Sequence, residues 1–310
     1  MKYICVQPSS LYYAWQIEVM LYSFIKNKVQ PQDIHIILAI QNGYKDNYFE
    51  QLQSRYPEVN FKFYEDDRPF SYYIPSIRPY LLSKYFKENP ELEKETIFYH
   101  DCDIVLTKPL EINHLLEDDI FYLSNTISYI GYNYIKSKGD DILQKMLQIM
   151  ELEEDLIKNN QNNSGGAQYV LKNVTSDFWY RAYTDSEKLF SQINQLNNHK
   201  KQQNSLYHEL QIWCADMWAV LWGIWRLGIE TKIDSKLDFT WAASPKSEWE
   251  RNSIFHNAGV TSNNEEMFYK ADYINQLPYN EELKLDPNKS SYYYFSLIKE
   301  VGNVLKYNKI

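Results

Sequence analysis

The first 125 residues alternate between short runs of apolar and β-branched residues and longer segments with helical periodicity. The runs predict strands at residues 3–6, 34–40, 60–64, 97–99 and 120–123. The periodic segments predict helices at residues 15–24, 49–56 and 79–86. Strands that alternate with helices are typical of βαβ units, so this pattern predicts an α/β fold around a largely parallel sheet.

Composition excludes several classes of protein. The chain has 310 residues, of which 44% are hydrophobic and 24% charged, as in folded globular proteins. Its length permits one large α/β domain or two smaller ones. The formal net charge of −9 argues against a broad binding surface for nucleic acid. A phosphate-bearing ligand would therefore need a local source of positive charge, such as a bound cation.

Three cysteines, Cys5, Cys102 and Cys214, are widely spaced and odd in number. They predict neither a disulfide framework nor a cysteine zinc cluster. The start of the chain lacks the apolar core and cleavage site of a secretory signal. The longest apolar run, residues 212–225, is shorter than the ~20 residues of a bilayer-spanning helix. We therefore expect a cytoplasmic protein with no integral membrane segment.

Two polar stretches, residues 151–163 and 191–205, predict loops or frayed helix ends. Each is either a mobile lid over a site or a solvated insertion. Near the end of the chain, residues 292–305 carry apolar side chains at helical spacing. Packing of this helix on the rest of the chain is favoured over docking to a membrane or a partner.

Asp101 and Asp103 follow the fourth expected strand. Alternate residues of a strand face the same side, so their carboxylates would lie together while Cys102 points away. Two such charges are best tolerated around a divalent cation, and oxygen ligands suit Mg²⁺ or Mn²⁺. The pair also falls at the carboxyl end of a strand, where open α/β sheets bind ligands. A solvated turn between two strands is the alternative.

In this context the pair resembles the Asp-x-Asp motif of GT-A-fold glycosyltransferases, which binds the diphosphate of a nucleotide sugar through a metal ion. The resemblance implies a Rossmann-type nucleotide-binding sheet with helices on both faces. It further implies a single catalytic domain at residues 1–262, with a nucleotide-binding half at 1–125 and an acceptor half at 126–262. Residues 263–310 would form a C-terminal helical extension packed on this domain.

Shorter motifs add to the resemblance. Trp15-Gln16 and Ile77-Arg78-Pro79-Tyr80 are similar to elements of the hydroxyproline arabinosyltransferase and peptidyl-serine galactosyltransferase group. His256 and Gly259 match the His-x-x-Gly of glycogenin-like retaining glycosyltransferases, whose imidazole is the third protein ligand of the metal. The Lys-Pro-Trp that follows in that family is absent, so its phosphate-binding lysine is not carried over. A purely structural histidine is the alternative reading.

Two further segments supply candidate residues. Gly165, Gly166 and Gln168 resemble a Gly-Gly-x-Gln loop that lies against the donor or acceptor sugar, although a turn that caps a helix would also use paired glycines. Asp216 lies within the apolar run and needs a partner when buried. It is expected either as the N-cap of the helix that follows or as a base or polar anchor, with Glu209 as a second candidate. For the tryptophans on one face of that helix, Trp218, Trp222 and Trp225, core packing is favoured over sugar stacking.

The resemblance implies a metal-dependent glycosyltransferase, of the hexosyl- or pentosyltransferase type, that transfers a sugar from a nucleoside-diphosphate donor to a hydroxyl group. The implied donor is a UDP-sugar, and the acceptor is a glycan, a protein or a small molecule. The implied metal is Mn²⁺ or Mg²⁺, and the His-x-x-Gly match favours a retaining outcome. The metal ligands would be Asp101, Asp103 and His256. The nucleotide-sugar contacts would be Gln7, Ser9, Arg78, Asp101, Gly165 and Gly166, and the catalytic candidates are Asp216, Glu209 and Gln168.

Two alternatives remain open. A sugar-nucleotide-forming nucleotidyltransferase has a similar topology, but it normally opens with a glycine-rich loop, and Gln7-Pro8-Ser9-Ser10 has no glycine. A carbohydrate-binding or nucleotide-sugar-binding protein without turnover would keep the same fold. The intact set of Asp101, Asp103 and His256 argues against this second alternative.

Overall fold

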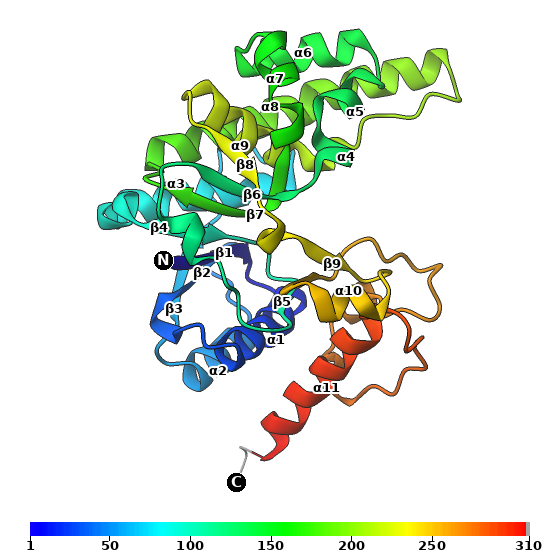
Figure 1. The fold of residues 1–310 in the computed structure, drawn as a ribbon. Helices are drawn as coiled ribbons and strands as arrows, with labels where there is room; N and C mark the ends of the chain where they lie inside the picture. Colours follow the sequence, from blue (N-terminus) through cyan, green and yellow to red (C-terminus); the bar gives the residue numbers. More distant parts are fainter. Residues whose placement is uncertain (308–310) are drawn as a thin grey trace. The chain divides into compact units, whose positions relative to one another are not determined.

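The computed structural model describes residues 1–307 as two compact units. Unit 1 comprises Met1–Lys2, Asp66–Tyr99 and Asn113–Ser235. Unit 2 comprises Tyr3–Glu65, His100–Ile112 and Lys236–Ile310, of which residues up to 307 are described. Each unit draws on separate stretches of the chain, and both combine strands with helices (Figure 1), so the α/β class is confirmed. The domain limits expected along the sequence stay a prediction.

Unit 2 begins with three parallel strands in the order β3-β2-β1. They are β1 (Lys2–Pro8), β2 (Ile34–Ile40) and β3 (Asn60–Glu65). Helix α1 (Leu11–Lys26) connects β1 to β2, and α2 (Tyr48–Arg55) connects β2 to β3. The middle residues of β1 and β2 are fully buried, as expected for parallel strands covered by helices. The predicted βαβ pattern is therefore confirmed for this part of the chain.

The rest of unit 2 contains a small sheet and a C-terminal helix. In this sheet β10 (Ile254–His256) is antiparallel to β5 (Ile104–Leu106) and parallel to β9 (Phe239–Trp241). Helix α10 (Lys246–Arg251) and α11 (Ser290–Tyr307) follow, and α11 packs against α1 and α10. The side chains of Phe295, Ile298 and Val301 on α11 are buried, which confirms the apolar stripe expected there.

Unit 1 holds four strands in the order β4-β7-β6-β8. They are β4 (Thr96–Tyr99), β6 (Phe121–Asn125), β7 (Gly165–Lys172) and β8 (Thr231–Ile233). Strand β7 runs antiparallel to both of its neighbours, so the expectation of a largely parallel sheet holds for β1 to β3 but not here. Its sequence opens with two glycines in place of the β-branched residues that predict a strand.

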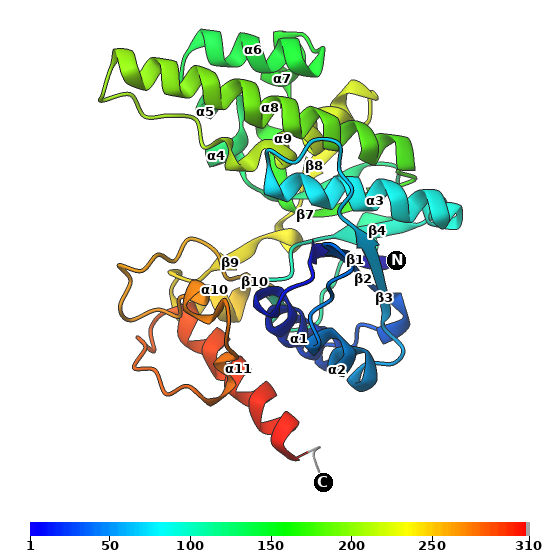
Figure 2. The same ribbon diagram turned by 180° about the vertical axis from the view of Figure 1, so that it is seen from behind.

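The helices of unit 1 include the longest of the described chain, α8 (Ser176–Gln203). The others are α3 (Ile77–Glu88), α4 (Ile127–Ile130), α5 (Tyr132–Lys136), α6 (Asp140–Met150), α7 (Glu154–Asn159) and α9 (Ala215–Arg226). Helix α8 packs against α3, α6 and α9, and its contact with α3 is visible in Figure 2. None of the described helices combines the length and apolar character needed to cross a membrane.

Both polar stretches expected as loops or frayed ends carry helix instead. Residues 191–203 form the second half of α8, and residues 154–159 form α7. The side chains of Ile193 and Asn197 explain the first error, because both are buried one turn apart on α8. The amide of Asn197 donates to the carbonyl of Leu210 (3.0 Å), which anchors the polar end of the helix.

Candidate metal centre

Asp101 and Asp103 follow β4, as expected, and lie in the turn between β4 and β5, so the alternation of side chains along a strand does not apply to them. Strand pairing still places them beside His256. Ile104, the first residue of β5, pairs with His256, the last residue of β10. The backbone amide of Asn257 donates to the carbonyl of Asp103 (2.9 Å), which extends this register by one residue. The two carboxylates and the imidazole therefore meet because β5, which follows the aspartates, pairs with β10, which ends at His256.

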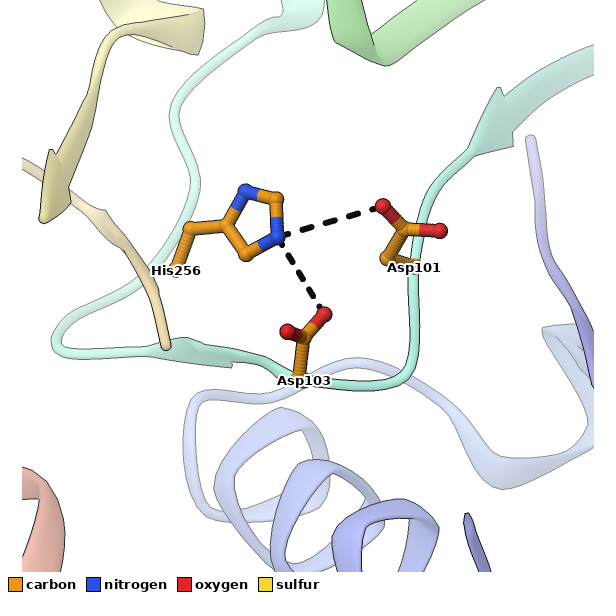
Figure 3. A group of neighbouring side chains, drawn as sticks. All are labelled: Asp101, Asp103 and His256. Atoms are coloured by element: carbon orange, nitrogen blue, oxygen red, sulfur yellow. Dashed lines mark ion pairs between the residues drawn. The ribbon is translucent and has the colours of Figure 1, made fainter. Parts of the chain in front are cut away.

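Figure 3 shows the three side chains pointing toward one another. The His256 Nε2 atom lies 3.2 Å from Asp103 Oδ1 and 3.8 Å from Asp101 Oδ2. One ligand atom from each residue lies within 4.8 Å of the other two. Asp103 and His256 are buried, whereas the Asp101 side chain is 24% exposed, so the cluster is open on one side. Two carboxylates and one imidazole fit a divalent cation such as Mn²⁺ or Mg²⁺.

A lysine that sequence reasoning missed completes the cluster. The Lys270 ammonium contacts the second oxygen of Asp103, Oδ2. Burial acts to raise the pKa of Asp103, but Lys270 and His256 outweigh it and hold the pKa well below its usual range. Burial likewise acts to lower the pKa of Lys270, and the Asp103 carboxylate raises it overall. Asp103 is therefore a buried carboxylate kept ionised by two nitrogen groups.

The orientation of the His256 ring is set by aromatic neighbours. Trp241 on β9 lies parallel to the imidazole, with 6.0 Å between ring centroids and 9° between planes. The Phe239 ring also packs on the imidazole, with 5.3 Å between ring centroids. Gly259 has a positive φ of 79°, and a Cβ there would lie 3.8 Å from Trp241. Within residues 1–307, the buried Nδ1 of His256 has no hydrogen-bond partner, so stacking holds the ring with Nε2 toward the carboxylates.

The predicted nucleobase contacts, Gln7 and Ser9, also lie in unit 2. Gln7 is in the last part of β1, Ser9 directly follows this strand, and both side chains are buried. The Ser9 hydroxyl accepts from the backbone amide of Asp46 (3.2 Å). The backbone amide of His100, next to Asp101, donates to the carbonyl of Ile4 on β1 (3.1 Å). The Asp101 turn is therefore tied to the strand that carries Gln7.

Arg78 and Asp216 form an ion pair within unit 1. The Arg78 Nη2 atom lies 2.5 Å from Asp216 Oδ2, and the buried Tyr73 hydroxyl lies 2.7 Å from Asp216 Oδ1. Asp216 is the second residue of α9, and the N-cap is Cys214, so the N-cap expectation for Asp216 is wrong. A carboxylate in the first turn still benefits from the helix dipole. Trp218, Trp222 and Trp225 are buried, which confirms their assignment to the core.

The remaining sequence candidates occupy different surroundings in unit 1. Gly165 and Gly166 begin strand β7 instead of a loop, and the positive φ falls on Ala167. A Cβ at Gly165 would lie 2.3 Å from Leu123 Cβ, so this glycine serves close strand packing. Gln168 is fully buried and accepts from the Ser124 hydroxyl (2.6 Å). Glu209 is exposed and pairs with Lys201 at 3.2 Å.

Comparisons with known proteins identify the fold. No protein-family model and no curated protein matches the sequence. Among solved structures, a WbbM bifunctional glycosyltransferase in its apo form matches with a TM-score of 0.52 and 12% identity over 97% of this chain. The chain spans about half of that protein (49%). Apo mouse xyloside xylosyltransferase 1 matches with a TM-score of 0.40 and 9% identity over 83% of this chain and 97% of its own.

At these identities the likeness is one of fold. The expected GT-A-like architecture agrees with the fold of the WbbM glycosyltransferase. The Asp101, Asp103 and His256 cluster lies in unit 2. The conclusion from fold and site together is that this chain has a glycosyltransferase-like α/β fold with a grouped set of Asp-x-Asp and histidine side chains.

Proposed function

We propose that the protein is a metal-dependent glycosyltransferase that transfers a hexosyl or pentosyl group from a UDP-sugar to an acceptor hydroxyl. The single observation that carries this proposal is the convergence of Asp101, Asp103 and His256 within 4.8 Å. The narrower hypothesis of kinship with the hydroxyproline arabinosyltransferase and peptidyl-serine galactosyltransferase group rests on short motifs. The cytoplasmic location remains part of the proposal.

Asp101, Asp103 and His256 would hold Mn²⁺ or Mg²⁺, which supplies Lewis-acid stabilisation of charge on the leaving diphosphate. Lys270 would add a second cation beside that charge, because its ammonium already lies on Asp103. Asp101 is the most exposed of the three ligands and would also reach the donor ribose. Gln7 and Ser9 would bound the nucleobase, and the sequence resemblance keeps Gly165 and Gly166 as proposed donor contacts.

The transfer would break the bond between the anomeric carbon and the diphosphate and form one to the acceptor oxygen, on the same face in a retaining outcome. The acceptor proton would pass to a diphosphate oxygen. Asp216 suits the role of a polar anchor, because Arg78 and Tyr73 already engage both of its oxygens. Glu209, which is exposed, is the alternative base, and Gln168 would hold a sugar hydroxyl only after its contact with Ser124 opens.

A thermal-shift panel tests the proposal. Wild type, Asp103→Ala and Asp101→Asn are each incubated with UDP, GDP, ADP or CMP, in Mn²⁺ or in EDTA. A nucleotide at about a hundred times its dissociation constant stabilises by about 2.7 kcal/mol, which is a shift of several degrees. We expect UDP to stabilise the wild type only with Mn²⁺, and both variants to lose this response.

Asp119→Asn is the matched control, because Asp119 is an exposed carboxylate of unit 1. It should respond as the wild type does. Absence of any nucleotide or metal effect on the wild type would refute the proposal. A positive panel is followed by a search for sugar transfer or donor hydrolysis from UDP-sugars, since binding without turnover would identify the non-catalytic alternative.

A further inference from the structure

Five large apolar side chains of unit 1 are exposed on and around the loop that precedes α3. Phe70 is 53% exposed and Tyr72 71%, and both lie in this loop. Ile74, which is 57% exposed, begins the short 3-10 helix Ile74–Ser76 directly before α3. Tyr180 on α8 is 48% exposed, and Trp213, just before α9, is 61% exposed. We call these five residues the aromatic surface. They share neighbours: Tyr73, which Tyr72 and Ile74 flank, contacts the Trp213 ring, and Tyr183 contacts both Phe70 and Tyr180. Exposed apolar side chains that lie near one another commonly mark a binding site.

The loop that carries this surface is held firmly by buried polar groups. The Glu187 carboxylate of α8, which is buried, accepts from the backbone amides of Tyr72 (3.1 Å) and Tyr73 (3.3 Å). The Tyr183 hydroxyl, also of α8, accepts from the backbone amide of Phe70 (2.9 Å). Because the backbone is fixed, ordering it costs little when a ligand binds.

Tyr73, which lies between the exposed Tyr72 and Ile74, points inward and connects the loop to Trp213. The Tyr73 ring is fully buried and stacks on Phe190, with 4.7 Å between centroids. Its hydroxyl contacts both the backbone carbonyl of Trp213 and the carboxylate of Asp216. The Trp213 ring meets the Tyr73 ring edge to face at 5.8 Å. One buried tyrosine therefore connects the aromatic surface to the Asp216 ion pair.

Two ion pairs lie close to this surface, and both involve residues at the start of the loop. Arg68 forms two contacts with Asp66, of 2.7 and 2.9 Å, and Lys84 lies 2.8 Å from Asp67. A ligand would thus meet ring faces and phenolic hydroxyls, with the charges of these two pairs compensated. The net charge of −9 further disfavours anionic lipids and phosphates. These properties favour a neutral ligand with both apolar and hydroxyl-bearing faces.

We propose that the aromatic surface binds a neutral saccharide, with the ring faces of Tyr72 and Trp213 as its main contacts. Pyranose rings offer an apolar face of C–H groups with hydroxyls around the rim, which matches aromatic rings that carry polar tips. Identification of this saccharide as the acceptor rests on the proposed glycosyltransferase function. It narrows the acceptor from a glycan, a protein or a small molecule to an oligosaccharide or the glycan part of a larger molecule.

Binding of neutral tetrasaccharides to the full chain, without nucleotide or metal, tests the proposal. The probes are maltotetraose, cellotetraose, chitotetraose, xylotetraose and mannotetraose, measured by saturation-transfer NMR and calorimetry. We expect at least one to bind, and Trp213→Ala and Tyr72→Ala each to weaken it at least tenfold, or ~1.4 kcal/mol. Tyr44→Ala, which removes a 65% exposed ring from unit 2, should change the affinity less than twofold.

Both substituted side chains are largely exposed, so both variants should melt close to the wild type. Failure of all five probes to bind, or binding that both variants retain, would overturn the proposal. Two other results would also overturn it if the wild type binds no saccharide. One is self-association, and the other is binding to anionic vesicles, in each case abolished by Trp213→Ala. If a saccharide binds at this surface but no sugar is transferred, the saccharide-binding proposal is supported and the proposed glycosyltransferase function fails. If the donor is hydrolysed with metal but no saccharide binds, the glycosyltransferase function is supported and the saccharide-binding proposal fails.

Discussion

His256 and Lys270 contact different oxygens of the Asp103 carboxylate, which is buried. A metal ion that binds Asp103 must therefore do so next to a fixed positive charge. Two unit charges about 4 Å apart interact by roughly 4 kcal/mol at an effective dielectric constant of ~20. At the scale of single residues, Lys270 thus opposes a metal while it supports an anionic ligand such as a diphosphate.

Lys270→Met should therefore bind Mn²⁺ more tightly than the wild type when no nucleotide is present. We expect at least a tenfold gain, about 1.4 kcal/mol, because the competing ammonium is gone while Asp101, Asp103 and His256 remain. The same variant should bind UDP in Mn²⁺ more weakly. Calorimetric titration of Mn²⁺ and then UDP measures both effects.

Lys289→Met is the matched control, because the Lys289 ammonium contacts the backbone carbonyl of Ala243 (3.2 Å) instead of a carboxylate. Its Mn²⁺ affinity should stay at the wild-type value. A lower Mn²⁺ affinity in Lys270→Met would contradict the argument, since it would mean that the lysine helps to assemble the metal ligands.

At the scale of elements, periodicity predicted the helices and strands whose apolar residues are close in sequence. Strands β1 to β3 and helices α1 to α3 all coincide with expected segments. The second half of α8 was not found, because its burial relies on a polar residue, Asn197, that bonds to Leu210 beyond the helix. Strand β7 was missed because glycines at its start replace the side chains that mark a strand.

The pairing of β6 with β7 gives an element-scale prediction about acid stability. Asp118, just before β6, accepts from the Tyr122 hydroxyl of β6 (2.6 Å) and from the Lys172 ammonium of β7 (2.9 Å). These bonds lower the pKa of Asp118 to about 2 from 3.8. Because the folded pKa is lower than the unfolded one, the contribution is complete above pH 3.8 and is lost as the pH falls toward 2.

Asp118→Asn should accordingly be less stable than the wild type at pH 7, and the difference should shrink between pH 4 and pH 2. Urea unfolding at a series of pH values measures it. The neighbouring Asp119→Asn, at an exposed position, should follow the wild type throughout. A constant difference between Asp118→Asn and the wild type at every pH would show that the ionised carboxylate is not what ties β6 to β7.

At the scale of the whole molecule, local motifs predicted candidate residues better than they predicted partners. Asp101, Asp103 and His256 were found because each lies in a short recognisable pattern. Lys270 contacts Asp103 across 167 positions, and Arg78 contacts Asp216 across 138. Neither contact leaves a periodic trace in the sequence. A lysine beside aromatic residues, as in Phe268-Tyr269-Lys270, was the local signal of a partly buried cation.

The division into two units predicts that metal binding and the Asp216 ion pair can be separated. All three ligand candidates belong to unit 2, whereas Asp216, Arg78 and Tyr73 belong to unit 1. Asp216→Asn should lower the free energy of unfolding by about 1–3 kcal/mol, because it removes the charge from hydrogen bonds with Arg78 and Tyr73. Its Mn²⁺ affinity should nevertheless remain within twofold of the wild type.

Asp101→Asn should show the opposite behaviour, with weak Mn²⁺ binding and near-normal stability, because its side chain is partly exposed. Calorimetric Mn²⁺ titration and urea unfolding of both variants test this crossed pattern. Loss of Mn²⁺ binding in a folded Asp216→Asn variant would mean that the ligand set extends beyond unit 2. In that case the acid of α9 would act at the metal itself, and its assignment as a polar anchor for the sugar would have to be abandoned.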